Sequence, residues 1–499
     1  MEETKGLQRR LGLVDATMLV AGSMIGSGIF IVSADIARTV GSAGWLLVVW
    51  LISGAVTLTA ALSYGELASM MPDAGGQYVY IRRAFGSLTS FLYGWTVFTV
   101  IQTGVIAAVG VAFAKFTAVL IPEVGMSADN IVWQLWSYTN EKGKLVEMNI
   151  YAGQILSVAV IALLTVVNLF GVKNGSIVQT VFTSAKLLAL LALIVLGIAV
   201  GMKGDTLTQN FADAWNTGTT WWQDTNTGIW HSQTGLAGWG LGLALGSAMI
   251  GSLFSSDAWN NVTFIAGEIK DPKRNIPRSL FLGTLIVTLL YVLANVAYLA
   301  LLPVQGTPDP GAGVMEQGIQ FASYDTDRVG TAAATLIFGS TAIVIMAVLI
   351  MISTFGCNNG LILAGARLYY AMANDKLFFK KAGKLNRFGV PGWALILQGI
   401  WAGLLCFSGT YGDLITYCTF ASLIFYIITI AGIFVLRKRE PDAPRPYKAF
   451  GYPWLPALYI VAATAICVCL LIDRTMNCVW SLVIVAVGLP VYFFFRPKG

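Results

Sequence analysis

Charged residues are scarce in this sequence, and their scarcity excludes most soluble proteins. Only 11% of the 499 residues are Asp, Glu, Lys or Arg, whereas soluble domains usually carry about 25%. Hydrophobic residues make up 56%, and the mean hydropathy is +0.72. The net charge of +6 is spread thinly and does not indicate a nucleic-acid partner. We therefore predict a membrane protein.

Histidine and suitably placed cysteine are also lacking. His231 is the only histidine, which excludes His-based metal sites, Ser-His-Asp triads and histidine proton relays. The six cysteines all lie late in the chain, inside or beside apolar stretches, so they offer neither a disulfide framework nor a zinc-binding spacing. We expect no metal, no cofactor and no enzymatic activity.

Long apolar runs are abundant. A helix needs about 20 apolar residues to cross a bilayer core of roughly 30 Å. Twelve stretches meet this requirement, and we expect an all-α polytopic membrane protein with twelve transmembrane helices. The predicted spans are 13–38, 44–68, 88–120, 150–171, 178–202, 238–266, 279–302, 329–372, 391–408, 412–436, 454–472 and 477–495.

The distribution of basic residues predicts the topology. If both termini lie in the cytoplasm, the loops on that side carry 23 of the 31 Lys and Arg residues. Such a bias is typical of cytoplasmic loops, so we expect a cell-membrane protein with cytoplasmic N- and C-termini. Splitting the span 329–372 would move the basic loop 376–387 outside, and we therefore predict one long helix there.

Two spans are interrupted by small and polar residues at mid-membrane depth. Gly22–Gly28 contains three glycines in seven residues, and Gly251–Asp257 lies 229 residues later, one five-span unit along the chain. An odd number of spans per unit inverts the second copy, an architecture found in many transporters. We expect a first repeat over 1–202, an extracellular loop over 203–237, a second repeat over 238–436 and two further helices over 437–499.

Broken helices suit a small zwitterion. Unwound backbone persists in a membrane only around a buried site or cavity, because lipid cannot satisfy its hydrogen bonds. The half-helix that begins near Gly26 directs N–H groups towards a carboxylate. The half-helices that end near Met24 and Phe254 offer carbonyl oxygens to an ammonium group. The alternative is that both clusters of small residues are helix-packing surfaces.

Several motifs resemble the amino acid–polyamine–organocation superfamily, specifically its L-type amino acid transporter branch. Gly22–Phe30 (GSMIGSGIF) resembles the first helix of that branch, and Phe254–Asn261 (FSSDAWNN) resembles its broken sixth helix. Asp271–Pro277 and Arg445–Lys448 extend the likeness along nearly the whole chain. The resemblance implies a leucine-transporter-like fold, with five plus five inverted helices followed by two more.

The resemblance also implies substrate-binding positions in both breaks. The substrate carboxylate would meet Gly26, Ser27 and Gly28, and the amino group would meet carbonyls at Met24 and Ile25 and near Phe254, whose ring would act as a gate. Ser255 would contribute to a pocket suited to a small side chain. Asn260 matches a position near the substrate, with helix capping or cross-linking as the alternative.

Three ionisable residues within the predicted spans need explanation. Lys186 costs at least ~2.5 kcal/mol in an apolar span, so we expect it to contact the broken first helix and Ser353, where the resemblance implies that it replaces a sodium ion. Snorkelling to the interface is the alternative. Asp257 is expected to cap the second half of helix six, or to contact a substrate ammonium or cationic side chain. Glu66 is either a structural residue at the interface or a proton carrier.

These observations together predict sodium-independent exchange of neutral L-amino acids by alternating access. The alternatives are proton-coupled symport, with Lys186 or Glu66 changing protonation, and exchange that includes cationic amino acids. Members that bind a heavy chain do so through a cysteine in the loop after span three. The loop 121–149 has none, so no disulfide-linked heavy chain is expected. The Trp-rich loop 203–237 is interpreted as an aromatic lid, or alternatively as a docking surface.

Overall fold

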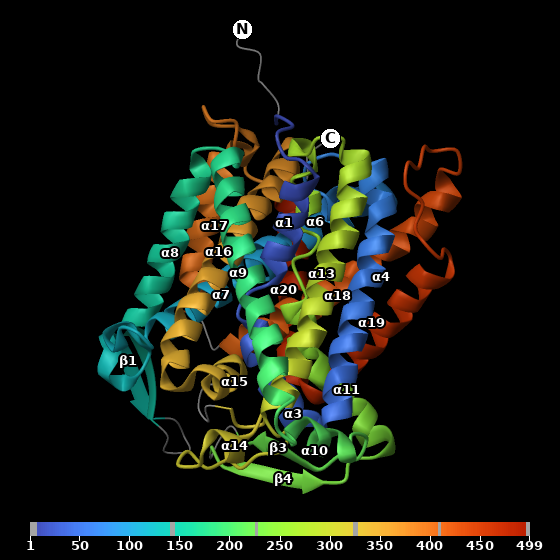
Figure 1. The fold of residues 1–499 in the computed structure, drawn as a ribbon. Coiled ribbons are helices and arrows are strands. Elements are labelled where there is room, and N and C mark those ends of the chain that lie inside the picture. Colours follow the sequence, from blue (N-terminus) through green and yellow to red (C-terminus); the bar gives the residue numbers. More distant parts are fainter. Residues whose placement is uncertain (1–6, 140–144, 225–227, 323–327, 408–410, 496–499) are drawn as a thin grey trace.

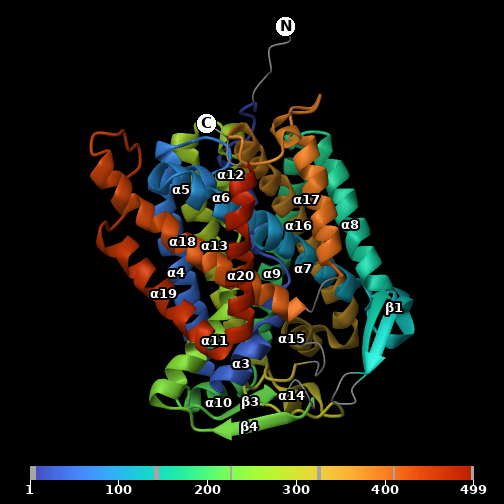
Figure 2. The same cartoon turned by 180° about the vertical axis from the view of Figure 1, so that it is seen from behind.

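Upright helices make up most of the molecule (Figure 1). The computed structural model describes residues 7–139, 145–224, 228–322, 328–407 and 411–495. The start of α1 and the end of α20 lie at one end of the bundle, and short helices and two β-hairpins cover the other end (Figures 1 and 2).

The first half of the chain contains α1 to α9. Its elements are α1 (Leu13–Met24), α2 (Gly28–Ile31), α3 (Ser33–Val40), α4 (Ala43–Met70), α5 (Gln77–Phe85), α6 (Ser87–Thr96), the π-helix η1 (Val97–Ile101), α7 (Gln102–Thr117), the short 3-10 turns η2 (Pro122–Val124) and η3 (Ala128–Asn130), β1 (Ile131–Thr139), β2 (Leu145–Tyr151), α8 (Ala152–Leu169) and α9 (Val172–Gly201).

The second half contains α10 to α20. Its elements are α10 (Thr206–Ala212), β3 (Thr219–Gln223), β4 (Trp230–Thr234), α11 (Gly238–Ser255), α12 (Asn261–Phe264), η4 (Ala266–Glu268), α13 (Pro272–Leu301), α14 (Val314–Gln317), α15 (Val329–Phe338), η5 (Gly339–Thr341), α16 (Ala342–Asn374), η6 (Lys380–Gly383), α17 (Gly392–Leu405), α18 (Tyr411–Arg439), α19 (Trp454–Asp473) and α20 (Thr475–Phe495).

The helices confirm a polytopic, predominantly helical membrane protein. Within the described residues, eleven helical segments are long and apolar enough to cross a bilayer. They correspond to eleven of the twelve predicted spans. The remaining span, 391–408, contains α17 of 14 residues, about 21 Å at ~1.5 Å per residue. Residue 408, the last of that span, lies outside the described residues.

The prediction of one helix over 329–372 is wrong. The chain forms α15 and α16, separated by the turn η5. Gly339 has φ +63°, a left-handed conformation that glycine adopts far more readily than other residues. The stretch Val329–Asn374 still counts as a single candidate membrane span, so the turn changes where its long helix begins and not the number of spans.

Two β-hairpins that the sequence did not predict lie in the loops opposite the chain termini. Strand β1 pairs with β2, and β3 pairs with β4, both antiparallel. In the predicted lid, the rings of Trp221 and Trp230 stand edge-on to Phe321, with centroids 5.4 and 5.1 Å away. The Arg38 guanidinium lies over Trp230 at 5.3 Å. Residues 140–144 and 225–227 of these loops lie outside the described part.

The two broken helices run side by side in opposite directions. The first half of helix one, α1, contacts α12, and its second half, α2, contacts α11. Long contacts of α13 with α4, α1 and α9 hold this pair in the middle of the bundle. This head-to-tail arrangement is what an inverted repeat requires, and it brings the two breaks together.

Candidate functional site

The two helix breaks meet at Gly28 and Ser255. A Cβ atom added to Gly28 would lie 2.1 Å from Ser255 Oγ, so the start of α2 and the end of α11 touch and leave no room for a side chain. The unwound segment is also sealed: Met24, Ile25 and Ser27 are at most 4% exposed. The first break is therefore buried from solvent in this structure.

The first break leaves backbone donors free. Helix α1 closes with the N–H of Ile25, whose own backbone is extended, with φ −77° and ψ 99°. Ser27 is the N-terminal flanking residue of α2. The N–H groups of Gly26 and Gly28 donate to no acceptor within the described part of the chain. Such donors at a helix start favour a negatively charged group.

The carbonyl groups of the two breaks are joined by a tyrosine that the sequence analysis missed. Tyr291 Oη, on α13, donates to the carbonyl oxygens of Met24 at 3.2 Å and Ser255 at 3.0 Å. Its side chain is 1% exposed and stacks edge-on against Trp50. A tyrosine in an otherwise apolar span needs a partner for its hydroxyl group. This requirement is the signal in the sequence that could have identified Tyr291.

Lys186 contacts the first break, as expected. Its Nζ atom donates to the carbonyl oxygens of Gly22, at 2.5 Å, and Ile25, and lies 3.4 Å from that of Ser353. The lysine is 2% exposed, so the snorkelling alternative is wrong. Ser353 Oγ also donates to the carbonyl oxygen of Gly26 at 3.0 Å. The predicted partners of Lys186 are thus confirmed.

Phe254 and Ser255 end the first half of helix six. Phe254 is half-buried and packs against the hydrophobic core. The Ser255 hydroxyl donates to the carbonyl oxygen of Gly251, one turn earlier in α11, at 2.8 Å. Both residues lie at the contact between the breaks. Their predicted substrate roles stay predictions.

Asp257 does not cap the second half of helix six. Asn260, not Asp257, flanks the start of α12, and no side chain caps that helix. The Asp257 carboxylate instead accepts hydrogen bonds from Tyr426 Oη and, at 3.4 Å, from Ser422 Oγ, both on α18. The capping prediction is wrong because Ala258, with φ +64°, turns the chain between Asp257 and α12.

A small cavity adjoins the Asp257 carboxylate. Its volume is about 20 Å³, and it is lined by residues of α4, the end of α11, α18 and α19, including Thr57, Thr419 and Tyr459. This space is enough for one water molecule. The hydrogen bonds of Asp257 with Tyr426 and Ser422, beside this cavity, connect the break in helix six to the neighbouring helix α18.

Asn260 cross-links helices, one of the alternatives that the sequence left open. Its Nδ2 donates to Gln77 Oε1 at 2.9 Å, and Gln77 Nε2 donates in turn to Thr429 Oγ1 at 2.9 Å. All three side chains are at most 5% exposed. This chain of hydrogen bonds joins the region just after the helix-six break to α5 and α18.

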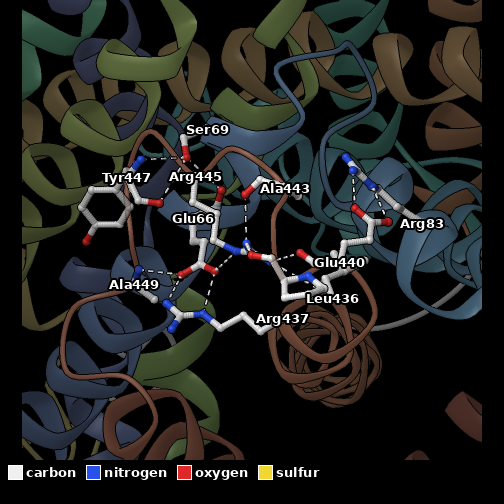
Figure 3. Close-up of polar contacts among 11 residues, drawn as sticks. Glu66, Ser69, Arg83, Leu436, Arg437, Glu440, Ala443, Arg445, Tyr447 and Ala449 are labelled. Carbon is white, nitrogen blue, oxygen red and sulfur yellow. Dashed lines mark hydrogen bonds and ion pairs between the residues drawn. The ribbon is translucent and has the colours of Figure 1, made fainter.

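Glu66 is fully engaged at the end of α4 (Figure 3). Arg437 donates to its two carboxylate oxygens at 2.9 and 2.6 Å, and Arg445 Nε lies 3.2 Å from Oε1. The backbone N–H of Ala449 adds a hydrogen bond of 2.7 Å to Oε2. With two guanidinium groups and an amide around a 1% exposed carboxylate, the geometry favours the structural interpretation.

Comparison with known protein families identifies a match along nearly the whole chain. A family model described as "Amino acid permease" matches residues 11–495. The chain belongs to the amino acid permease family. This match includes both helix breaks and Lys186, and it confirms the resemblance to the amino acid–polyamine–organocation superfamily. The permease is a multi-span membrane protein of a transporter family.

Individual relatives are similar to the permease over nearly its full length. The serine/threonine exchanger SteT of Bacillus subtilis (strain 168) is 29% identical, with 99% of each chain covered. The large neutral amino acids transporter small subunit 2 of Homo sapiens is 28% identical over 98% of this chain and 80% of its own. The b(0,+)-type amino acid transporter 1 of Mus musculus is 26% identical, covering 99% and 89%.

Proposed function

We propose that this permease exchanges neutral L-amino acids across the cell membrane by alternating access, without sodium. The single observation that carries the proposal is the meeting of two helix breaks around free N–H groups, with the Lys186 ammonium against the carbonyls behind them. Membership of the family and the names of the relatives support amino acids as the substrate class and exchange as the mode.

The substrate carboxylate would bind the N–H groups of Gly26, Ser27 and Gly28. The carbonyl oxygens proposed for the ammonium group, at Met24 and Ile25, already accept hydrogen bonds from Tyr291 and Lys186. A carbonyl oxygen has two lone pairs, so that of Met24 can accept a second hydrogen bond. The oxygen of Ile25 also lies 3.3 Å from Ser353 Oγ, so substrate binding there would require Ser353 to donate to Gly26 alone.

The substrate side chain would meet residues of the second break. Phe254 would close over it as a gate, and Ser255 would limit its size because it already lies against Gly28. Asn260 would act indirectly, because its amide is bound to Gln77. A tight pocket of this kind favours small neutral amino acids.

Sodium independence rests on Lys186. A buried ammonium that bridges the carbonyl oxygens of Gly22 and Ile25 supplies the positive charge that a bound cation would otherwise bring. Because this charge is covalently attached to α9, it cannot be carried across the membrane with the substrate. The proposal therefore predicts exchange that needs no sodium gradient.

Alternating access would use the two repeats, 1–202 and 238–436, with 203–237 as the outer loop and 437–499 as added helices. The first break is buried, so a substrate can reach it only when helices move apart. We propose cytoplasmic termini, because 23 of the 31 basic residues lie on that side in this orientation. We propose no disulfide-linked heavy chain, since the loop 121–149 has no cysteine.

Two alternatives remain to be tested alongside exchange. Proton-coupled symport would need a carboxylate or amine that gains and loses a proton, and the double ion pair of Glu66 disfavours that residue. Exchange of cationic amino acids would use Asp257, whose carboxylate is bound to Tyr426 and Ser422. Both alternatives therefore require rearrangement of contacts that are present in this structure.

Uptake by proteoliposomes distinguishes these mechanisms. The purified permease would be reconstituted, and uptake of labelled L-serine, L-alanine, L-leucine and L-arginine measured without sodium. Vesicles would be empty or preloaded with unlabelled amino acid, with and without an inward proton gradient. Heat-inactivated protein provides the background.

Exchange predicts uptake of neutral amino acids chiefly into preloaded vesicles, unchanged by added sodium. Strong uptake into empty vesicles only under the proton gradient would instead establish symport. L-Arginine uptake comparable to that of L-serine would establish the cationic alternative. Absence of uptake for all four substrates under every condition would refute amino acid transport.

A further inference from the structure

A groove of about 630 Å³ lies between the first turns of α13 and the loop that follows α18. It is on the end of the bundle that carries the start of α1, because Arg10 and Leu11 there hydrogen-bond to Glu268, just before α13. Its lining residues are Leu62, Lys273, Arg274, Pro277, Arg278, Phe281, Pro446, Tyr447, Lys448 and Phe450. None of them belongs to the proposed substrate site.

The wall formed by the loop is held firmly in place. The Tyr447 ring packs on Gly65, where an added Cβ atom would lie 2.8 Å from Cε1 and 3.3 Å from Pro277 Cβ. The Tyr447 N–H donates to Ser69 Oγ at 3.2 Å, and the neighbouring Ala449 N–H donates to Glu66. Figure 3 shows this attachment of the loop to α4. These contacts fix the loop against α4, so the groove has a defined wall.

Four cationic side chains converge on the groove. Lys273, Arg274 and Arg278 come from α13, and Lys448 comes from the opposite wall. All four are exposed. Within the described residues, none of them makes an ion pair or a side-chain hydrogen bond. Like charges gathered in this way repel one another, and an anion placed among them relieves the repulsion.

Apolar surface leads away from these charges along α13. Leu282, Ile286, Leu289 and Leu293 are 38 to 54% exposed and follow a helical spacing that places them on one side of the helix. Arg278, which lines the groove, lies one turn before Leu282 and therefore at the start of this stripe. Phe450, in the groove lining, is 70% exposed, and Trp454, four residues later at the start of α19, is 82% exposed. Exposed tryptophan beside a basic cluster is typical of the membrane interface.

We propose that this groove binds an anionic phospholipid, with its phosphate among the four cations and its acyl chains along the apolar stripe of α13. Arginine and lysine bind phosphate oxygens through charge-assisted hydrogen bonds. Basic pockets at the ends of transmembrane helices recognise anionic headgroups in this way. A soluble phosphate compound would satisfy the charges but leave Phe281, Phe450 and the stripe exposed to water.

The position of the groove suggests what the lipid does. It is bounded by α4, through Leu62, by α13 and by the loop that Glu66 holds. A lipid bound there contacts all three at once and ties them together. It is separate from both helix breaks, so binding can be measured without transport, and failure of one proposal leaves the other standing.

Native mass spectrometry of the delipidated full-length protein tests the site. Phosphatidylglycerol would be titrated, with phosphatidylcholine as the zwitterionic lipid and sn-glycerol 3-phosphate as the free phosphate compound. The groove variant combines Lys273→Gln, Arg274→Gln, Arg278→Gln and Lys448→Gln. The control variant also loses four charges, at the exposed Lys376, Lys380, Lys381 and Lys384 beyond α16.

We expect phosphatidylglycerol to bind the unaltered protein at least about tenfold more tightly than phosphatidylcholine. The groove variant should lose at least about tenfold in affinity, and the control variant less than about twofold. Equal binding by the groove variant and the unaltered protein, or equal losses in both variants, would overturn the proposal. Competition by sn-glycerol 3-phosphate at the lipid's own concentration would identify a free phosphate site instead.

A single substitution provides a second test in case the groove variant does not fold. Arg278→Gln removes one charge at an exposed position and should weaken phosphatidylglycerol binding about fivefold, the effect expected of one cation at the membrane surface. Its unfolding temperature in detergent without anionic lipid should equal that of the unaltered protein. An unchanged affinity in this folded variant would also count against the site.

Discussion

The ammonium group of Lys186 lies 2.5 Å from the carbonyl oxygen of Gly22 and also donates to that of Ile25. It therefore donates hydrogen bonds to carbonyl oxygens at the end of α1 that have no backbone N–H partner within the helix. Carbonyl oxygens at a helix end need such partners. The lysine thus links α9 to the break at which substrate is proposed to bind.

Replacing Lys186 with alanine should reduce exchange by at least about tenfold. The carbonyl oxygens of Gly22 and Ile25 lose their donor, and each buried unsatisfied group costs about 1–3 kcal/mol. Uptake into preloaded proteoliposomes measures the loss. The matched control is Lys173→Ala, because Lys173 is an exposed lysine at the start of the same helix and its removal should leave exchange unchanged.

Sodium should partly restore exchange in Lys186→Ala. The vacated position is surrounded by the carbonyl oxygens of Gly22, Ile25 and Ser353, and oxygen ligands suit a hard cation. Uptake by the variant would be compared in sodium and in choline buffers. Full activity of the variant in choline would contradict the proposed role of Lys186.

Replacing Glu66 with glutamine should destabilise the permease without altering its pH dependence. The change removes the charge that Arg437 and Arg445 face, and breaking a buried ion pair costs about 3 kcal/mol. This is the low end of the usual range, in keeping with Arg437 being 24% exposed. The free energy of unfolding in micelles measures the loss. A flattened pH profile of the remaining transport would instead favour the proton-carrier interpretation.

Glu440→Gln is the control for this experiment. Its carboxylate pairs with Arg83 nearby (Figure 3), but both side chains are about one-third exposed, and such surface pairs contribute about 1 kcal/mol or less. The hydrogen bond from Arg83 lowers the pKa of Glu440. The pair therefore contributes above the pKa of the unfolded state, and its contribution disappears as the pH falls through the folded pKa.

Much of the fold follows from the sequence because each membrane crossing must be long and apolar. Both helix breaks could be located, since three glycines within Gly22–Gly28 and the polar run before Asp257 have no place in a plain anchor. The turn at Gly339 was missed because a single glycine in an apolar run is common in membrane helices. The β-hairpins were missed because hydropathy identifies spans and says little about the loops between them.

In the candidate site, the sequence indicates which side chains need partners but not always which partners they find. Lys186 could be assigned to the first break because a buried charge must find a partner. Tyr291, Gln77 and Tyr426 could not be placed, since their partners cannot be identified until the packing of α13, α5 and α18 is known. Asp257 was misassigned for that reason. Its hydrogen-bond partner Tyr426 lies 169 residues away in sequence.

Asp257→Asn and Tyr426→Phe should show coupled effects. Each change weakens the contact between the helix-six break and α18, so the double variant should lose less than the sum of the single losses. A coupling energy of about 1–3 kcal/mol is usual for residues in direct contact. The free energies of unfolding of the unaltered protein, the two single variants and the double variant, measured in micelles, complete the double-mutant cycle. Tyr459→Phe is the control, because Tyr459 lines the same cavity without a hydrogen bond to Asp257 within the described residues.

Substrate preference separates this positioning role from direct contact. If Asp257 acts only through α18, Asp257→Asn should lower uptake of L-serine and L-arginine by the same factor. A selective loss of L-arginine uptake would show that the carboxylate recognises a cationic side chain. Additive stability losses in the double variant would exclude the proposed coupling altogether.

Gly28→Ala should be far more damaging than Gly26→Ala. A Cβ atom at Gly28 would lie 2.1 Å from Ser255 Oγ and 2.8 Å from Ser255 Cβ, whereas one at Gly26 would meet only Cys357 Sγ at 3.5 Å. Overpacking of this kind costs about 1–3 kcal/mol and would push the two breaks apart. We expect loss of exchange in Gly28→Ala, with stability close to normal in Gly26→Ala.

Adding Ser255→Gly to Gly28→Ala tests whether this clash is the cause. The second change removes both atoms that the new methyl group would strike, so unfolding temperature and exchange should recover at least in part. Ser255→Gly alone serves as the reference, because it also removes the hydrogen bond to Gly251. If the double variant is no better than Gly28→Ala, the defect arises at the N–H groups of the first break and not from contact between the two helices.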